Sequence, residues 1–200
     1  MSPQIHTGRA WRWLAVALSL ISNVCMAQSA SYAGQFENDD DLFKTYFTLN
    51  FASTFTASTF SFASGGFSPE LSLFDTSCAL LQWAPGSGSG SCGPGTWDAC
   101  MSLTSLAAGQ YMLVLTQDGN GPVGSSLSEG FRMTGQPSFT QASVGATAGN
   151  FWQVDGTQRT GQWALSLSAA GLAPVPEPSS LALMCAGLLG LRVLRRRSAH

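Results

Sequence analysis

The sequence predicts an all-β protein whose main domain is an antiparallel β-sandwich or a jelly-roll-like domain. Three observations favour this fold class. Only 10% of the 200 residues are charged and glycine occurs 22 times, whereas soluble chains usually contain about 25% charged residues. Several segments alternate apolar and polar residues with period two, while no stretch between residues 31 and 170 keeps a helical period. Clusters of turn-forming residues separate these segments.

The first half of the domain is expected to contain two strands and a hairpin. Residues 46–50 and 53–62 are rich in aromatic and β-branched residues, as strands are. Residues 71–74 and 80–83 are apolar runs on either side of Asp75-Thr76-Ser77, which predicts a hairpin. Glycine-rich turns follow at residues 86–95.

Two more strands are expected in the second half. Residues 110–116 place bulky side chains on both faces, which indicates a strand at the centre of a packed sheet. Residues 162–169 alternate Trp163, Leu165 and Leu167 with alanine and serine, as a half-exposed strand should. A run of Asp-Gly-Asn-Gly at 118–121 marks a turn between these segments.

The N-terminal segment has the pattern of a secretory signal helix. Arg9 and Arg12 precede an apolar run at residues 13–24, and small residues follow up to Ala27. This order predicts a signal peptide over residues 1–27, cleaved after Ala27. The alternative is an uncleaved anchor, but the run is shorter than the roughly 20 apolar residues of a spanning helix. A lipoprotein signal centred on Cys25 is a weaker alternative.

The C-terminal segment combines a proline motif, a short apolar run and a basic end. Pro176-Glu177-Pro178 favours extended backbone. Residues 179–194 would form about 24 Å of helix, short of a hydrocarbon core of about 30 Å. Arg192 interrupts this run, and Arg195, Arg196 and Arg197 follow it. We therefore expect a short apolar helix that is a poor permanent anchor, although an ordinary C-terminal anchor is an alternative.

These C-terminal residues resemble the PEP-CTERM sorting signal of Gram-negative bacteria. The resemblance implies that a membrane-embedded exosortase cuts near the motif and passes the protein to the outside. The arginines would stay cytoplasmic by the positive-inside rule. The expected organisation is a signal peptide at 1–27, a β-sandwich at 28–170, a linker with the proline motif at 171–178, and the apolar helix with its arginine cluster at 179–200.

The body of the chain carries a second resemblance. The segments Tyr32-Ala33-Gly34, Asp39-Asp40-Asp41-Leu42-Phe43 and 65–75 are followed by 106–111, 115–118 and 159–165. Together they resemble the pre-peptidase C-terminal-like β-sandwich family found in many PEP-CTERM proteins. The family often has a further acidic pair after the hairpin, where this chain has Trp83-Ala84-Pro85-Gly86.

The charge distribution excludes some partners and permits others. Residues 28–174 contain three basic and ten acidic residues, a net charge of −7. An acidic body without a basic patch argues against nucleic-acid binding. Asp39, Asp40 and Asp41, with Asp118 from another loop, are candidate calcium ligands because calcium prefers clustered hard oxygens. The alternative is an acidic turn whose carboxylates cap backbone amides.

Three cysteines lie in the region expected to be exported, where disulfides form. Cys92–Cys100 would close a short loop and is the predicted bridge, while Cys78–Cys92 is the alternative. Such a bridge would contribute about 2–3 kcal/mol by restricting the unfolded chain.

Catalytic chemistry has few candidate residues. The two histidines are His6 and His200, so the body holds no Ser-His-Asp or Cys-His arrangement. A hydrolase built on two carboxylates is conceivable, but no pattern nominates the pair. Trp97, in the glycine-rich loop, is a candidate for stacking on a sugar ring.

We therefore expect a non-catalytic, exported protein of the cell surface or extracellular matrix, without a cofactor unless calcium binds. The alternative is a carbohydrate-binding module of the exopolysaccharide matrix. The expected partners are an exosortase-type enzyme, the inner membrane transiently, and exopolysaccharide.

Overall fold

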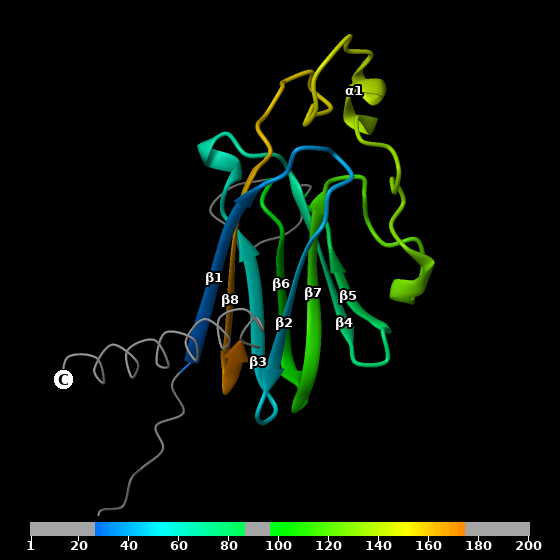
Figure 1. Ribbon diagram of the computed structural model, residues 1–200. Coiled ribbons are helices and arrows are strands. Elements are labelled where there is room, and N and C mark those ends of the chain that lie inside the picture. Colours follow the sequence, from blue (N-terminus) through cyan, green and yellow to red (C-terminus); the bar gives the residue numbers. More distant parts are fainter. Residues whose placement is uncertain (1–26, 87–96, 175–200) are drawn as a thin grey trace, which may run out of the picture.

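A computed structural model describes residues 27–86 and 97–174, and in these residues nine strands form two antiparallel sheets (Figure 1). The four-stranded sheet has the order β1 (Ala27–Gln35), β8 (Gln162–Ala170), β3 (Ser53–Thr59), β6 (Cys100–Leu106). The five-stranded sheet has the order β5 (Leu80–Ala84), β4 (Pro69–Asp75), β7 (Gly109–Gln117), β2 (Phe43–Leu49), β9 (Leu172–Pro174). The predicted all-β, sandwich-like class is confirmed. The expected signal helix and C-terminal apolar helix fall outside the described residues.

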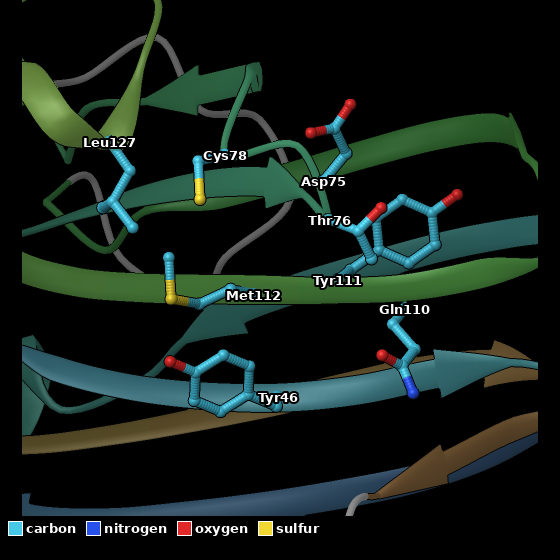
Figure 2. A pocket seen from close by; sticks show the side chains of 8 residues that line it. All are labelled: Tyr46, Asp75, Thr76, Cys78, Gln110, Tyr111, Met112 and Leu127. Carbon is cyan, nitrogen blue, oxygen red and sulfur yellow. The ribbon is translucent and has the colours of Figure 1, made fainter.

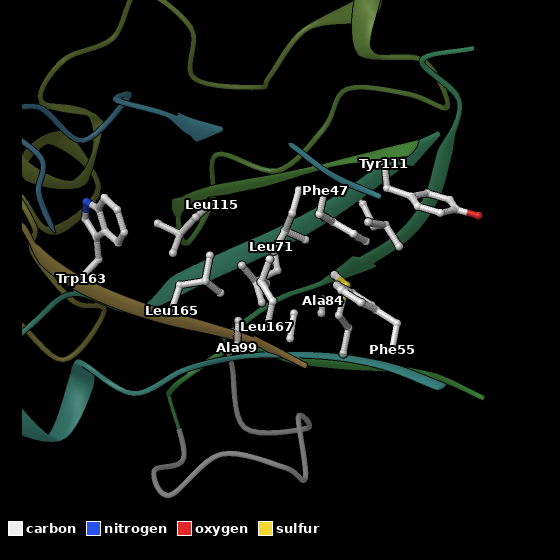
Figure 3. Packing of buried hydrophobic residues seen from close by; sticks show 14 of the residues in the cluster. Phe47, Phe55, Leu71, Ala84, Ala99, Tyr111, Leu115, Trp163, Leu165 and Leu167 are labelled. Atoms are coloured by element: carbon white, nitrogen blue, oxygen red, sulfur yellow. The ribbon is translucent and has the colours of Figure 1, made fainter. Parts of the chain in front are cut away.

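The core lies between the two sheets and is built from alternate residues of each strand (Figure 3). Phe47 and Phe55 stack across the layers with ring centroids 4.8 Å apart. At the other end of the core, Trp163 packs against Phe43 with centroids 4.4 Å apart. Each fully buried large side chain contributes about 1.5–3 kcal/mol. This layer of aromatic and leucine side chains therefore holds the sheets together.

β7 is the central strand of its sheet, as the apolar residues on both its faces predicted. It pairs with β4 on one side and β2 on the other. Leu113 and Leu115 belong to the core between the sheets. Met112 and Val114 join Phe74 and Phe131 in a second buried cluster. A covered outer face explains why this strand is apolar throughout.

The predicted hairpin at residues 71–83 is formed by β4 and β5. The Asp75 carboxylate accepts hydrogen bonds from Ser77 N and Ala79 N, both at 2.9 Å, and from Ser77 Oγ at 2.6 Å. These bonds lower the pKa of Asp75. The carboxylate therefore fixes the turn that joins the two strands.

Three strands were not expected from sequence: β1, β6 and β9. β1 is mostly exposed and contains small residues, so its alternation is faint. Gly34 in β1 leaves room for the Trp163 indole, which would lie 2.5 Å from an added Cβ. The small residue at position 34 therefore allows Trp163 on the neighbouring strand β8 to pack against β1.

The sandwich is longer at both ends than the predicted 28–170. Ala27, which was assigned to the signal peptide, pairs with Ala170. Gly171, with a φ of 72°, turns the chain between the two sheets. Leu172, which was assigned to the linker, is fully buried and pairs with Leu49. An apolar side chain after a glycine turn explains why the domain continues to residue 174.

Short helices lie in the connections after β3 and between β7 and β8. η1 (Phe62–Ser64) follows β3, η2 (Leu127–Glu129) and α1 (Phe139–Val144) lie between β7 and β8. α1 sits beyond one end of the sandwich (Figure 1). We call this the loop end of the molecule.

Candidate functional site

A pocket of about 220 Å³ lies among the loops and strand ends at the loop end of the sandwich. We call it the loop-end pocket. Two tryptophans, two glutamines and one acid contribute to its wall, and its lining residues are Ser68, Trp97, Gln117, Asp118, Gly119, Met133, Phe139, Thr140, Ser143, Trp152, Gln153 and Val154. They come from six separate stretches of the chain, so the pocket exists only in the folded sandwich.

The two glutamines of the pocket have unused hydrogen-bonding atoms. Gln117, the last residue of β7, is 2% exposed, and Gln153 is 9% exposed. Gln117 Oε1 and Gln153 Nε2 are buried and have no hydrogen-bond partner among the described residues. A buried polar atom without a partner costs about 1–3 kcal/mol, so each such atom calls for an explanation. Both glutamines also belong to the wall of the loop-end pocket.

The two tryptophans are held in place by their surroundings. The Trp97 ring lies 6.1 Å from the Phe62 ring, and the Arg159 guanidinium lies 4.0 Å from the Phe62 centroid. Arg159 also donates from Nε to Gly66 O at 3.0 Å. Trp152 Nε1 donates to the carbonyl groups of residues 148 and 149, both at 3.1 Å. Both half-buried rings are therefore held by contacts with neighbouring residues.

Asp118 is the acid of the loop-end pocket, and a second carboxyl group lies behind it. Glu70 is 2% exposed and accepts from Trp83 Nε1 and from Gly119 N, both at 3.0 Å. Burial, with a smaller contribution from the neighbouring Asp118, raises the pKa of Glu70 to about 7. Because Glu70 binds the amide next to Asp118, it holds the 118–121 turn against the sheet. Sequence reasoning had not selected Glu70.

A second pocket, of about 340 Å³, lies over the outer face of the five-stranded sheet (Figure 2). Tyr46 and Met112 lie on neighbouring strands, and Cys78 and Leu127 reach the pocket from loops. We call it the sheet-face pocket. Its acid is Asp75, whose carboxylate is occupied by the β4–β5 turn. It therefore offers fewer polar groups for recognition than the loop-end pocket.

The candidate calcium ligands bind the protein's own donors. Asp39 is fully buried and accepts from Phe151 N at 2.6 Å, Thr140 N at 2.8 Å and Thr140 Oγ1 at 2.6 Å. Asp40 accepts from Gly135 N, and Asp41 accepts from the amides of residues 37 and 38. This is the capping arrangement that the alternative interpretation described.

Asp118 is not grouped with these three aspartates. Within residues 27–86 and 97–174, no three His, Cys, Asp or Glu side chains form a group that could hold a metal ion. Calcium binding by Asp39, Asp40, Asp41 and Asp118 therefore stays a prediction.

The structure describes two of the three cysteines, Cys78 and Cys100. Cys78 is a free, exposed thiol, so the alternative Cys78–Cys92 bridge is not formed. Cys100 takes part in a disulfide. Cys92 lies outside the described residues, so the predicted Cys92–Cys100 pairing stays a prediction.

Comparison with known families identifies the C-terminal segment. Residues 174–197 match the PEP-CTERM protein-sorting motif. This signal indicates an exported protein that an exosortase sorts across the membrane to the cell surface. Its residues Pro176, Glu177 and Pro178, and Arg195 to Arg197, lie outside the described part of the chain. The resemblance of the body to the pre-peptidase C-terminal-like family stays a prediction.

A search of curated proteins found no match to the chain. Within the residues that the structure describes, no helix is both long and apolar enough to cross a membrane.

Proposed function

We propose that this protein is a non-catalytic β-sandwich that is released to the cell surface or the extracellular matrix after an exosortase-type enzyme has read its C-terminal motif. The sorting motif at residues 174–197 is the observation that carries the proposal. The apolar run inside the motif is too short to be a strong anchor. The protein therefore occupies the inner membrane transiently and is separated from its tail.

The loop-end pocket supports the non-catalytic assignment. A glycosidase needs two carboxyl groups facing the substrate. Asp118 is the one acid among the residues that line this pocket, and both oxygens of Glu70 are taken by N–H donors. The pocket therefore has the groups for binding but lacks an acid pair directed at a substrate.

Mass spectrometry of the exported protein tests the sorting proposal. We expect an N-terminus near Gln28 and the loss of the apolar segment and arginine cluster. Replacing Pro176, Glu177 and Pro178 with alanine should leave the uncut chain in the membrane fraction, whereas replacing the exposed Val154 should not. Full-length chain held stably in the membrane of wild-type cells would contradict the proposal.

The second candidate function is carbohydrate binding at the loop-end pocket. Stacking on Trp97 and Trp152 suits the apolar face of a sugar ring, and the side-chain amides of Gln117 and Gln153 in the pocket wall suit its hydroxyl groups. The acid Asp118 is a further acceptor for hydroxyl hydrogens. A neutral saccharide is favoured because the body of the chain carries a net negative charge.

A glycan array of neutral oligosaccharides, followed by titration of the strongest binder, tests this function. Trp97→Ala, Gln117→Leu and Gln153→Leu should each weaken binding about tenfold or more, since each removes about one hydrogen bond or stacking contact. The leucine variants break no hydrogen bond of Gln117 Oε1 or Gln153 Nε2, so the fold should persist. Tyr46→Ala, in the sheet-face pocket, is the matched aromatic control and should bind normally. Equal binding by all variants would exclude the loop-end pocket.

A further inference from the structure

Among the described residues, no strand pairs with the outer edge of β1, which is therefore an exposed pairing surface. Within the described residues, four strands end the two sheets: β1, β6, β5 and β9. An exposed edge presents unpaired N–H and C=O groups, and proteins usually protect it by short length, charge, proline or a bulge. β1 has none of these protections.

The other three edges each carry such a feature. β5 has five residues and pairs with β4 through a register shift. β6 pairs with β3 through a register shift between Ser53 and Phe55. β9 has three residues and ends in Pro174. β1, by contrast, has nine residues without charge or proline and an unbroken register with β8.

The backbone groups that face outward from β1 follow from its pairing. Phe36 N donates to Gly161 O at 2.9 Å, one position beyond the last β1–β8 pair. Backbone groups alternate sides along an antiparallel strand. Even-numbered residues therefore face β8, and Ser29, Ser31 and Ala33 direct their N–H and C=O groups outward. All three are exposed.

We propose that this edge pairs with the same edge of a second copy of the chain. Antiparallel pairing about Ser31 places Ser29 of one copy opposite Ala33 of the other and the two Ser31 residues opposite each other. This gives about six backbone hydrogen bonds and joins two four-stranded sheets into one. The side chains are small and uncharged, so neither bulk nor like charge opposes the approach.

A second copy of the same chain is the partner that best fits this edge. A twofold axis requires a surface that is complementary to itself, and an uncharged antiparallel edge meets that requirement. The β1 edge lies apart from the residues that line the loop-end pocket. A dimer that forms through β1 would therefore leave the loop-end pocket of each copy open. The inference does not depend on the proposed carbohydrate binding.

Analytical ultracentrifugation of the exported protein, at concentrations up to about 1 mM, tests the proposal with two proline variants. Ser31→Pro removes an outward amide and no bond to β8, which an edge strand tolerates. It should weaken dimerisation about thirtyfold or more, because both copies lose a hydrogen bond. Ser102→Pro is the matched control, since Thr59 N pairs with Ala99 O and Ser102 N therefore faces away from β3. This variant should dimerise as the wild type does.

Hydrogen exchange separates this arrangement from others. In the dimer, the amides of Ser29, Ser31 and Ala33 should be protected, and dilution should remove that protection. A protein that stays monomeric at every concentration would overturn the proposal. So would a dimer whose β1 amides exchange freely, or protection that persists in the monomer, which would mean that a segment of the same chain covers the edge.

Discussion

The buried Glu70 carboxyl group should make the fold less stable as the pH rises. Its pKa is about 7 in the folded chain, against 4.5 for an ordinary glutamate. Between these two values the folded state binds more protons than the unfolded state, so unfolding becomes easier with increasing pH. A difference of this size corresponds to about 3 kcal/mol. This stability is fully present below about pH 4.5 and is lost as the pH rises through about 7.

Denaturant unfolding followed by tryptophan fluorescence, at a series of pH values from 4.5 to 8, measures this effect. Glu70→Gln cannot ionise and should remove most of the slope, although it loses an acceptor for Trp83 or Gly119 and so starts from a lower stability. Glu37→Gln changes an exposed side chain and should keep the wild-type slope.

The other shifted carboxyl groups act at lower pH and do not disturb the measurement. The pKa values of Asp75 and Asp155 are lowered by hydrogen bonds from nearby residues, so their contribution to stability is lost only in more acidic solution. A wild-type stability that stays flat or increases between pH 5 and pH 7.5 would refute the reasoning. An unchanged slope in Glu70→Gln would refute the assignment to this residue.

Three further predictions concern packing and anchoring, and unfolding measurements check each of them. Gly121→Ala should destabilise by about 1–3 kcal/mol because an added Cβ would lie 2.7 Å from Glu70 Oε2; wild-type stability would mean that the turn can move. Asp39→Ala should lower the free energy of unfolding by about 2–4 kcal/mol with or without a calcium chelator, because it leaves three hydrogen-bond donors without their acceptor. A loss seen only with calcium present would favour the calcium prediction. Leu172→Ala should cost about 2–5 kcal/mol because this residue is fully buried, and a negligible cost would place it outside the folded domain.

The strands with a buried face could be predicted from the sequence because burial imposes alternation. β8 has bulky side chains at alternate positions, and β7 has apolar side chains on both faces because both of its faces are covered. Both strands were expected within about one residue of their observed ends. β1 could not be found in this way, since its two partly buried residues, Ala30 and Tyr32, lie among exposed small residues. Its strand conformation depends on pairing with β8, which is distant in sequence.

The candidate site was predictable only in part for a similar reason. Trp97 was selected because an aromatic residue in a glycine-rich loop is conspicuous. Gln117 and Gln153 carry no local signal: one ends a buried strand and the other lies in an irregular segment. Their importance comes from the fold, which brings both to one pocket and leaves them without partners.

The position of the sorting motif next to the last strand has a consequence for processing. Pro174 pairs with Phe47 in the sheet, and the proline motif begins at Pro176. Two extended residues span about 7 Å, so an enzyme that cuts near the motif must approach the folded sandwich closely. Inserting a short Gly-Ser linker between Pro174 and Val175 should therefore speed cleavage in a pulse-chase experiment. The same insertion between Val154 and Asp155, in an exposed turn, should not. Equal cleavage rates in all three proteins would show that access beside β9 does not limit the enzyme.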